Sequence, residues 1–156
     1  MPVSMQANND MQLACTGLVY ELYHALDEHE YGDLNRLFTQ DAHFVRLGKS
    51  IAGSTAIVDA FRQRPADMAT RHVITNPIVR ATGPDTAEGV FYMLVVRRHG
   101  VAHETPRPLM VSGPWRLSVV SVQFQNTTEG WCIARQQTDS QFEFPETNIP
   151  DTSEAL

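Results

Sequence analysis

The sequence predicts an α+β domain in which three N-terminal helices cover one face of an antiparallel sheet. Near the N-terminus, apolar residues recur at steps of three and four, which is typical of amphipathic helices. From residue 72 onward, long stretches rich in β-branched and aromatic residues alternate with turn signals at hairpin spacing. Helices followed by strands, rather than strands alternating with helices, favour an α+β arrangement over a parallel sheet.

The first helix is predicted to run from about Asp10 to Glu30. Asp10 is a suitable N-cap, and Gly32 is well placed to end the helix because glycine readily adopts the left-handed conformation. The apolar stripe of this helix is formed by Met11, Cys15, Leu18, Leu22 and Leu26.

Two shorter helices and five strands are predicted after it. The second helix would turn Leu34, Leu37 and Phe38 inward, and a third helix would begin at Gly53-Ser54 and stop before Pro65. Between these helices, residues 42–47 alternate weakly and indicate a short strand. The remaining strands are predicted at His72–Arg80, Ala87–Arg98, Leu109–Gln125 and Gly130–Phe144.

Length and composition indicate one globular domain. The 156 residues are 42% hydrophobic and 19% charged, which suits a single packed core. We expect this domain at residues 11–144, with a flexible tail at 1–10 and an acidic tail at 145–156 that is frayed or wraps a neighbour. The formal charge of -6 argues against nucleic acid or an anionic membrane as a partner.

The two cysteines and the N-terminal stretch bear on location. Cys15 and Cys132 could form at most one disulfide, so buried thiols in a reducing compartment are the favoured interpretation. The first ten residues lack a positive start and an apolar run, and no apolar segment approaches the length of a membrane span. The sequence therefore predicts a cytoplasmic protein.

Asp27 and His72 are the candidate catalytic residues. Asp27 falls in the last turn of the first helix, where the helix dipole disfavours a carboxylate, so helix stability does not explain it. His72 shares a predicted strand face with Ile74 and Ile78, which should face the interior. A carboxylate that accepts a bond from one imidazole nitrogen leaves the other nitrogen free to act as a base. From the residues alone, a solvated acid and a half-buried structural histidine stay open as alternatives.

Other side chains could shape a pocket or polarise a substrate. Tyr20 and Tyr23 share a helix edge with Asp27, and we expect Tyr20 to pack while Tyr23 could contact a substrate carbonyl. The predicted pocket walls are Leu22, Leu26, Phe91, Met93, Trp115 and Trp131, although such residues are more often core.

The chain lacks recognisable metal and nucleotide motifs. His99, His103 and Glu104 lie in a Gly- and Pro-rich loop, without a helix to present two imidazoles on one face. His24 and His29 are five residues apart and face different sides of the first helix. We therefore expect neither a metal nor another cofactor, and the sequence contains no glycine-rich phosphate loop or serine elbow.

Four blocks of sequence resemble the SnoaL-like branch of the nuclear transport factor 2-like superfamily. They are residues 25–42, 53–61, 70–76 and 129–134, and the resemblance extends from about Met11 to Phe144. It implies a curved, mixed sheet wrapped around the helices into a cone, an α+β barrel with a pocket at its open end. The resemblance also implies a homodimer or homotrimer.

The resemblance also implies roles for the two candidate residues. In relatives such as scytalone dehydratase and hexachlorocyclohexane dehydrochlorinase, an aspartate at the position of Asp27 orients a histidine at the position of His72, which removes a substrate proton. His99 falls near a second catalytic histidine of the dehydratase, and the resemblance therefore adds it to the predicted pocket residues. This chain departs from that enzyme at Leu26, where the relative has a carbonyl-polarising tyrosine.

Two functional hypotheses follow from these observations. The first is a cofactor-independent lyase, dehydratase or isomerase acting on a hydrophobic, cyclic molecule of polyketide, steroid or terpenoid type, with Tyr23 as a possible polarising donor. The second is a non-catalytic binding or assembly subunit that resembles the β subunits of ring-hydroxylating dioxygenases. An open cavity that reaches Asp27 and His72 favours the enzyme, and a filled pocket favours the subunit.

Overall fold

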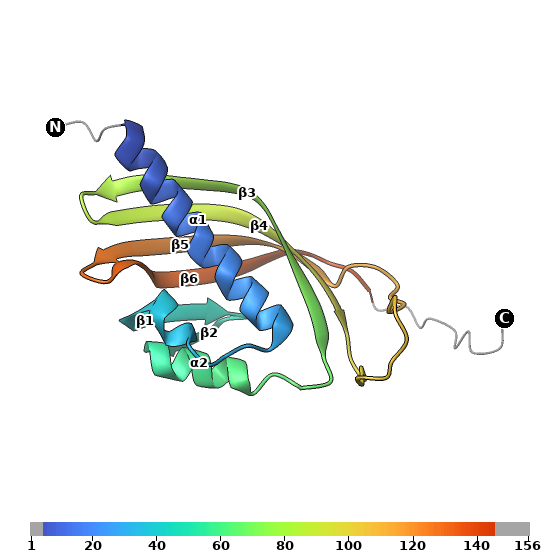
Figure 1. The fold of residues 1–156 in the computed structure, drawn as a ribbon. Helices are drawn as coiled ribbons and strands as arrows, with labels where there is room; N and C mark the ends of the chain where they lie inside the picture. The colour runs from blue at the N-terminus through green and yellow to red at the C-terminus, as the bar shows by residue number, and fades with distance from the viewer. Residues whose placement is uncertain (1–4, 146–156) are drawn as a thin grey trace, which may run out of the picture.

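A mixed, curved sheet with helices on one face makes up the fold (Figure 1). The computed structural model describes residues 5–145. The elements are α1 (Met5–Glu28), a 3-10 turn (Leu34–Leu37), β1 (Phe38–Arg46), β2 (Lys49–Ala52), α2 (Ser54–Arg62), β3 (Ala69–Gly83), β4 (Thr86–Arg98), β5 (Arg116–Thr127) and β6 (Gly130–Glu143).

In the strand order β2-β1-β6-β5-β4-β3, the first strand, β1, lies beside the last strand, β6. Strands β3 to β6 form an antiparallel meander, while β1 pairs with β6 in parallel and with β2 antiparallel. The predicted α+β class with a mixed sheet is therefore confirmed. Helix α1 lies diagonally across one face of this sheet, and α2 lies beside β1 and β2 (Figure 1).

Helix α1 differs from its prediction at both ends. It begins at Met5, so residues 5–10, expected in a flexible tail, are helical, and the Asp10 carboxylate accepts a bond from the Gln6 amide inside the helix. It ends at Glu28, because His29 adopts a left-handed φ of 58°. The Glu30 amide then donates to the Ala25 carbonyl at 2.9 Å, which closes a Schellman motif. Gly32 therefore does not end this helix, as the sequence had suggested.

The second predicted helix is a single 3-10 turn of four residues, since Phe38 is already extended and begins β1. The structure adds a strand that the sequence did not predict. Residues Arg46 and Lys49 pair across a two-residue turn in which Leu47 and Gly48 both have positive φ. Leucine is unfavourable in such a turn, which is why the hairpin leading to β2 lacks the usual sequence signal.

The strand predicted to begin at Leu109 begins only at Arg116. Pro114 lies in the intervening segment, Pro106 and Pro108 lie just before it, and proline has no amide hydrogen with which to join a sheet. Residues 99–115 therefore form a long connection between β4 and β5. The expected acidic tail lies outside the described residues from position 146 onward.

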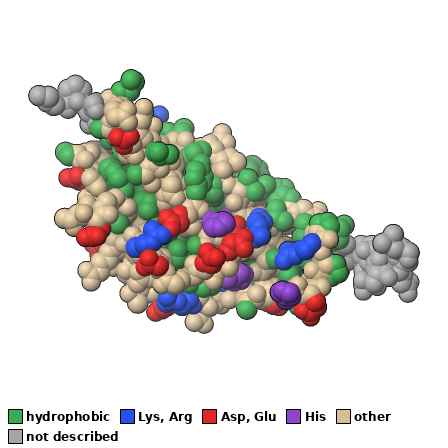
Figure 2. Space-filling model, in the orientation of Figure 1, with side chains coloured by type: hydrophobic (Ala, Val, Ile, Leu, Met, Phe, Trp, Pro, Cys, Tyr) green, Lys and Arg blue, Asp and Glu red, His purple; other side chains and the backbone are tan. Residues whose placement is uncertain are grey.

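One apolar core fills the space between α1, α2 and the inner face of the sheet. Cys15 and Cys132 are both buried free thiols, as the sequence predicted, and burial raises the pKa of Cys15 to about 12. On the face that carries α1, acidic and basic side chains are interspersed (Figure 2). Within residues 5–145, no helix combines the length and the apolar character needed to cross a bilayer.

Candidate functional site

Asp27 and His72 lie in direct contact where the end of α1 meets the start of β3. The Nδ1 atom of His72 is 2.6 Å from Oδ1 of Asp27, and the His72 backbone amide donates to Oδ2 at 2.8 Å. Because an ionised carboxylate can only accept, Nδ1 carries the hydrogen and Nε2 keeps its lone pair when the ring is neutral. The side chains are 8% and 11% exposed, so the pair is largely shielded from water.

The Asp27 carboxylate is held in its ionised form by its hydrogen bonds. Burial raises the pKa of Asp27, but the side-chain and backbone bonds from His72 and the bond from Thr70 together outweigh it and lower the pKa below its ordinary value. The Thr70 hydroxyl donates to Oδ1 at 2.8 Å. Asp27 therefore remains a carboxylate at neutral pH.

Arg64 holds together the chain segments that carry Asp27 and its hydrogen-bond partner Thr70. Its guanidinium donates to the Leu26 carbonyl at 2.7 Å and to the Thr70 hydroxyl at 2.9 Å. It thereby ties the segment after α2 to the last turn of α1 and to β3. Sequence reasoning missed Arg64, because nothing in its local pattern indicates a contact with residues 38 positions away.

A cavity of about 270 Å³ opens beside His72. His72 is part of its wall, while Asp27 lies behind the imidazole and is absent from the lining. The apolar part of the lining consists of Leu26, Phe44, Ile51, Ala60, Phe61, Pro65, Met68, Met93, Val95 and Trp115. The polar part consists of Tyr23, Arg46, Arg64, Thr70, His72, Arg97, Arg116, Ser118 and Thr138.

Tyr23 also belongs to the cavity wall. Its ring centre lies 4.9 Å from that of His72, and its hydroxyl accepts a bond from the Gln136 amide at 2.6 Å. Burial raises the pKa of Tyr23, so the hydroxyl keeps its proton at neutral pH. The Gln136 bond uses the Tyr23 oxygen as an acceptor, and the side chain of Thr138, also in the cavity wall, is a second hydrogen-bond neighbour of this hydroxyl.

The predicted wall residues divide into two groups. Leu26, Met93 and Trp115 line the cavity. Four others do not line the cavity: Leu22, Phe91, Trp131 and His99. Leu22 is fully buried in the core, and the ring of Phe91 packs on that of Tyr23. Trp131 packs against the core at the start of β6, and His99 is exposed just after β4.

Sequence reasoning also missed the arginines of the cavity and its three small hydroxyl residues, Thr70, Ser118 and Thr138. Arg97 is two positions after Val95, which lines the cavity and follows the predicted wall residue Met93 by two positions, and Ser118 is two positions after Arg116. Strand alternation therefore contained the signal, since every second side chain of a strand shares a face.

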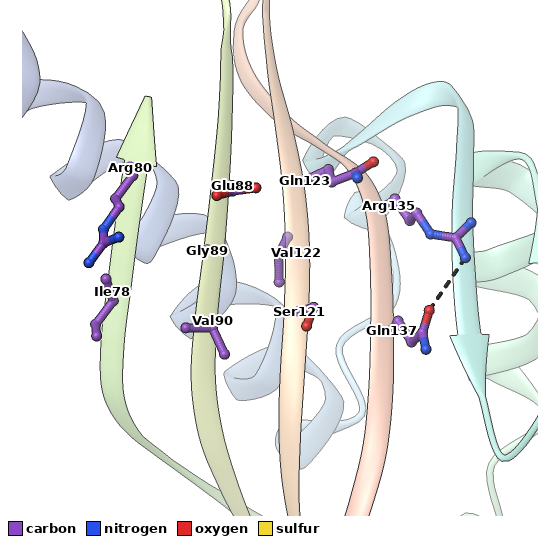
Figure 3. A pocket seen from close by; sticks show the side chains of 10 residues that line it. All are labelled: Ile78, Arg80, Glu88, Gly89, Val90, Ser121, Val122, Gln123, Arg135 and Gln137. Carbon is purple, nitrogen blue, oxygen red and sulfur yellow. Dashed lines mark hydrogen bonds between the residues drawn. The ribbon is translucent and has the colours of Figure 1, made fainter. Parts of the chain in front are cut away.

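A larger hollow of about 420 Å³ lies on the outer face of the sheet, away from α1 (Figure 3). Its residues come from β3 to β6, and none of the predicted catalytic side chains is among them. In the described part of the chain, no group of three or more His, Cys, Asp or Glu side chains is arranged to hold a metal ion.

The lowered pKa of Asp27 predicts how the free energy of unfolding depends on pH. Its folded pKa lies below its unfolded value of about 3.9, so ionisation of Asp27 adds stability above that pH, and the contribution is lost as pH falls through the folded pKa. We expect the wild type to lose more free energy of unfolding than Asp27→Asn between neutral pH and pH values below about 4. Urea unfolding of both proteins across this range measures the difference, and parallel acid profiles would contradict the prediction.

Most of the chain is similar to one known protein family. A family model described as a SnoaL-like domain matches residues 10–137. No curated protein matches the chain in sequence.

Several solved structures share the fold. A protein with a cystatin-like fold from Nostoc punctiforme is 17% identical, with a TM-score of 0.71, and the match covers 93% of this chain and 98% of that one. A type 2 hexachlorocyclohexane dehydrochlorinase is 15% identical, with a TM-score of 0.73 and coverage of 90% and 91%. An aromatic ring hydroxylase-like protein from Novosphingobium aromaticivorans is 23% identical, with a TM-score of 0.69 and coverage of 87% and 92%. At these identities the likeness concerns the fold alone.

Proposed function

Because the chain belongs to the SnoaL-like family, we propose that it is a cofactor-independent lyase, dehydratase or isomerase in which His72 is the general base and Asp27 its orienting partner. The observation that supports this most is the 2.6 Å bond between Asp27 and Nδ1 of His72 beside an open cavity. That bond fixes the tautomer and leaves Nε2 as the base.

In the proposed reaction, Nε2 of His72 takes a proton from a carbon next to a carbonyl group. The electrons of the broken C–H bond form a double bond to the carbonyl carbon, while the carbonyl π electrons move to its oxygen and give an enolate. In an elimination, the enolate re-forms the carbonyl group, its double-bond electrons form a new carbon–carbon double bond, and the leaving group departs from the next carbon with its bonding electrons. In an isomerisation of an enone, the carbonyl group re-forms and the electrons of the extended enolate take the proton back from the imidazolium at another carbon. Asp27 stabilises the imidazolium in both cases.

Tyr23 is the proposed donor to the substrate carbonyl. Its protonated hydroxyl belongs to the cavity wall beside His72, where it could stabilise negative charge on the carbonyl oxygen. This proposal gives Tyr23 the polarising role that the dehydratase assigns to a tyrosine at the position of Leu26.

Removing the Tyr23 hydroxyl tests this role. We expect Tyr23→Phe to lower kcat by about 10²–10³-fold, the usual effect of losing one donor to a developing oxyanion. KM should change little, because the bond strengthens only as charge develops. Steady-state kinetics checks this, with Tyr20→Phe on the exposed side of α1 as the matched control. A fall confined to affinity would contradict the role.

The experiment that tests the proposed function is proton exchange in heavy water. Cyclic ketones and enones with and without a leaving group are incubated with the protein, and loss of the α-proton signal is followed by NMR. Both elimination and isomerisation begin with proton removal, so this signal does not require the true product to be known. Exchange catalysed by the wild type supports the enzyme. Tight binding without exchange supports the alternative, a binding or assembly subunit.

The open cavity favours the enzyme over that alternative, because a subunit with only a structural role has no need of space beside the dyad. At about 270 Å³ the cavity is slightly smaller than the roughly 300–1,000 Å³ typical of ligand pockets, which suits a compact cyclic substrate. A cytoplasmic location and assembly into a homodimer or homotrimer remain part of the proposal.

A further inference from the structure

Three guanidinium groups gather around the indole ring of Trp115 in the cavity wall. The Cζ atom of Arg97 lies 3.5 Å from the ring centre, that of Arg116 lies 4.3 Å away and that of Arg46 lies 6.0 Å away. Each can interact favourably with the ring, but the three positive charges repel one another. The cluster therefore favours an anion among its members.

Arg116 is a largely buried cation whose ion-pair partner is exposed. Its side chain is 11% exposed and pairs with Glu143 at 2.6 Å, but the Glu143 side chain is 66% exposed. The Nε atom of Arg116 is buried and has no hydrogen-bond partner. None of the described residues that line the cavity is an aspartate or a glutamate. The counterion of Arg116 is therefore exposed, and no acidic side chain among the described cavity-lining residues faces this guanidinium.

The surroundings of Arg46 indicate the same electrostatic conflict. Arg46 is exposed at the end of β1, but partial burial of its guanidinium and the positive charges of Arg64, Arg116 and Arg97 lower its pKa. Arg64 is already engaged with Leu26 and Thr70, as described above. Arg46 and Arg116 are therefore the better candidates to receive an anionic group.

Ser118 supplies an independent sign of a polar ligand. It is 0% exposed, lines the cavity, and its hydroxyl has no hydrogen-bond partner. A buried hydroxyl without a partner is unfavourable unless something else in the site completes its hydrogen bond. Since Ser118 follows Arg116 by two positions on β5, both side chains face the same side of the sheet.

The sheet register sets the distance between this cluster and the proposed base. His72 pairs with Val95, and Val95 pairs with Arg116, so the three residues form one row across β3, β4 and β5. With strands about 4.8 Å apart, the Cα atoms of His72 and Arg116 are roughly 10 Å apart. The apolar side chains of Val95 and Met93 line the cavity between them. This spacing suits an apolar ring held between a base and a cation.

We infer that the substrate is a carboxylic acid of one or two rings, whose carboxylate binds Arg116, Arg46 and Ser118 while its reacting carbon lies against His72. A carboxylate matches the planar fork of a guanidinium and is smaller than a phosphate, which suits the limited volume of the cavity. The position of the reacting carbon rests on the proposed function, whereas the carboxylate subsite does not.

Matched ligands without a reactive carbon test the subsite. Calorimetric titration compares 2-naphthoate with 2-naphthamide, which has the same rings and no charge, and with 2-naphthyl phosphate. We expect the wild type to bind naphthoate at least about tenfold more tightly than naphthamide. Arg116→Gln should remove this preference while leaving naphthamide binding unchanged. Arg62→Gln, at an exposed arginine paired with Asp59, is the matched control and should change neither affinity.

The remaining variants separate binding from folding and from catalysis. Unchanged naphthamide binding shows that Arg116→Gln keeps its cavity, and Ser118→Ala, which keeps all charges, should weaken naphthoate several-fold. His72→Ala should retain the preference for naphthoate even if no compound undergoes proton exchange. The inference would be overturned if the wild type bound the acid and the amide equally well or bound neither. It would also be overturned if the preference for the acid survived in Arg116→Gln, or if the phosphate bound more tightly than the acid.

Discussion

His72→Ala is expected to lower the rate of catalysed proton exchange by about 10²–10⁴-fold, the usual contribution of a positioned general base. The physical reason is that Nε2 is the sole lone pair left on the imidazole once Nδ1 donates to Asp27. No other imidazole lines the cavity among residues 5–145, so the structure offers no substitute base of this kind there.

The measurement is the NMR exchange rate of the wild type and the variant on the same ketone. His103→Ala, at an exposed position in the 99–115 connection, is the matched control and should exchange at the wild-type rate. Small-molecule imidazole added to His72→Ala should restore part of the rate, because the space left by the ring borders the cavity. If His72→Ala exchanged protons at the wild-type rate, the proposed mechanism would be contradicted.

The parts of the fold that the sequence predicts well are those encoded by local periodicity. The apolar stripe of α1 and the alternation in β4 each reflect the face that is buried, so their positions could be predicted. In β3 the prediction that Ile78 shares the interior face of His72 is wrong, because the strand shifts register at Asn76, which has a positive φ, so that Ile78 is exposed and Val79 is buried. The C-terminal end of α1 could not be predicted, because His29 takes a left-handed conformation that is uncommon for residues other than glycine. The β1–β2 hairpin could not be predicted either, because Leu47 also has a positive φ and occupies a turn position that favours glycine or asparagine.

The site shows a similar division between local and long-range information. Asp27 and His72 could be singled out because each is polar where its element should be apolar or uncharged. Their contact joins residues 45 positions apart, and only the family resemblance brought them together before the structure did. The arginines were overlooked because charged residues at strand ends are usually solvated. The packing of Arg97 and Arg116 against Trp115 depends on how β4 and β5 meet the long connection between them.

Asp27→Asn is expected to reduce proton exchange nearly as much as loss of His72, by about 10²–10⁴-fold, although asparagine has almost the same shape. The carboxylate oxygens of Asp27 accept bonds from Nδ1 and from the backbone amide of His72. If the asparagine oxygen keeps the backbone bond, its NH₂ group faces Nδ1 and must donate to it. The imidazole hydrogen then moves to Nε2, and the cavity loses its base.

This mechanism predicts a spectroscopic change as well as a kinetic one. Nitrogen NMR of the His72 ring should show the hydrogen on Nδ1 in the wild type and on Nε2 in Asp27→Asn. Asp59→Asn, on the exposed face of α2, should leave both the tautomer and the exchange rate unchanged. Asp27→Glu, which restores the negative charge with a longer side chain, should recover the wild-type tautomer and part of the rate. Full exchange in Asp27→Asn with the tautomer reversed would show that His72 is not the base, whereas full exchange with the tautomer unchanged would show that Asp27 does not orient it.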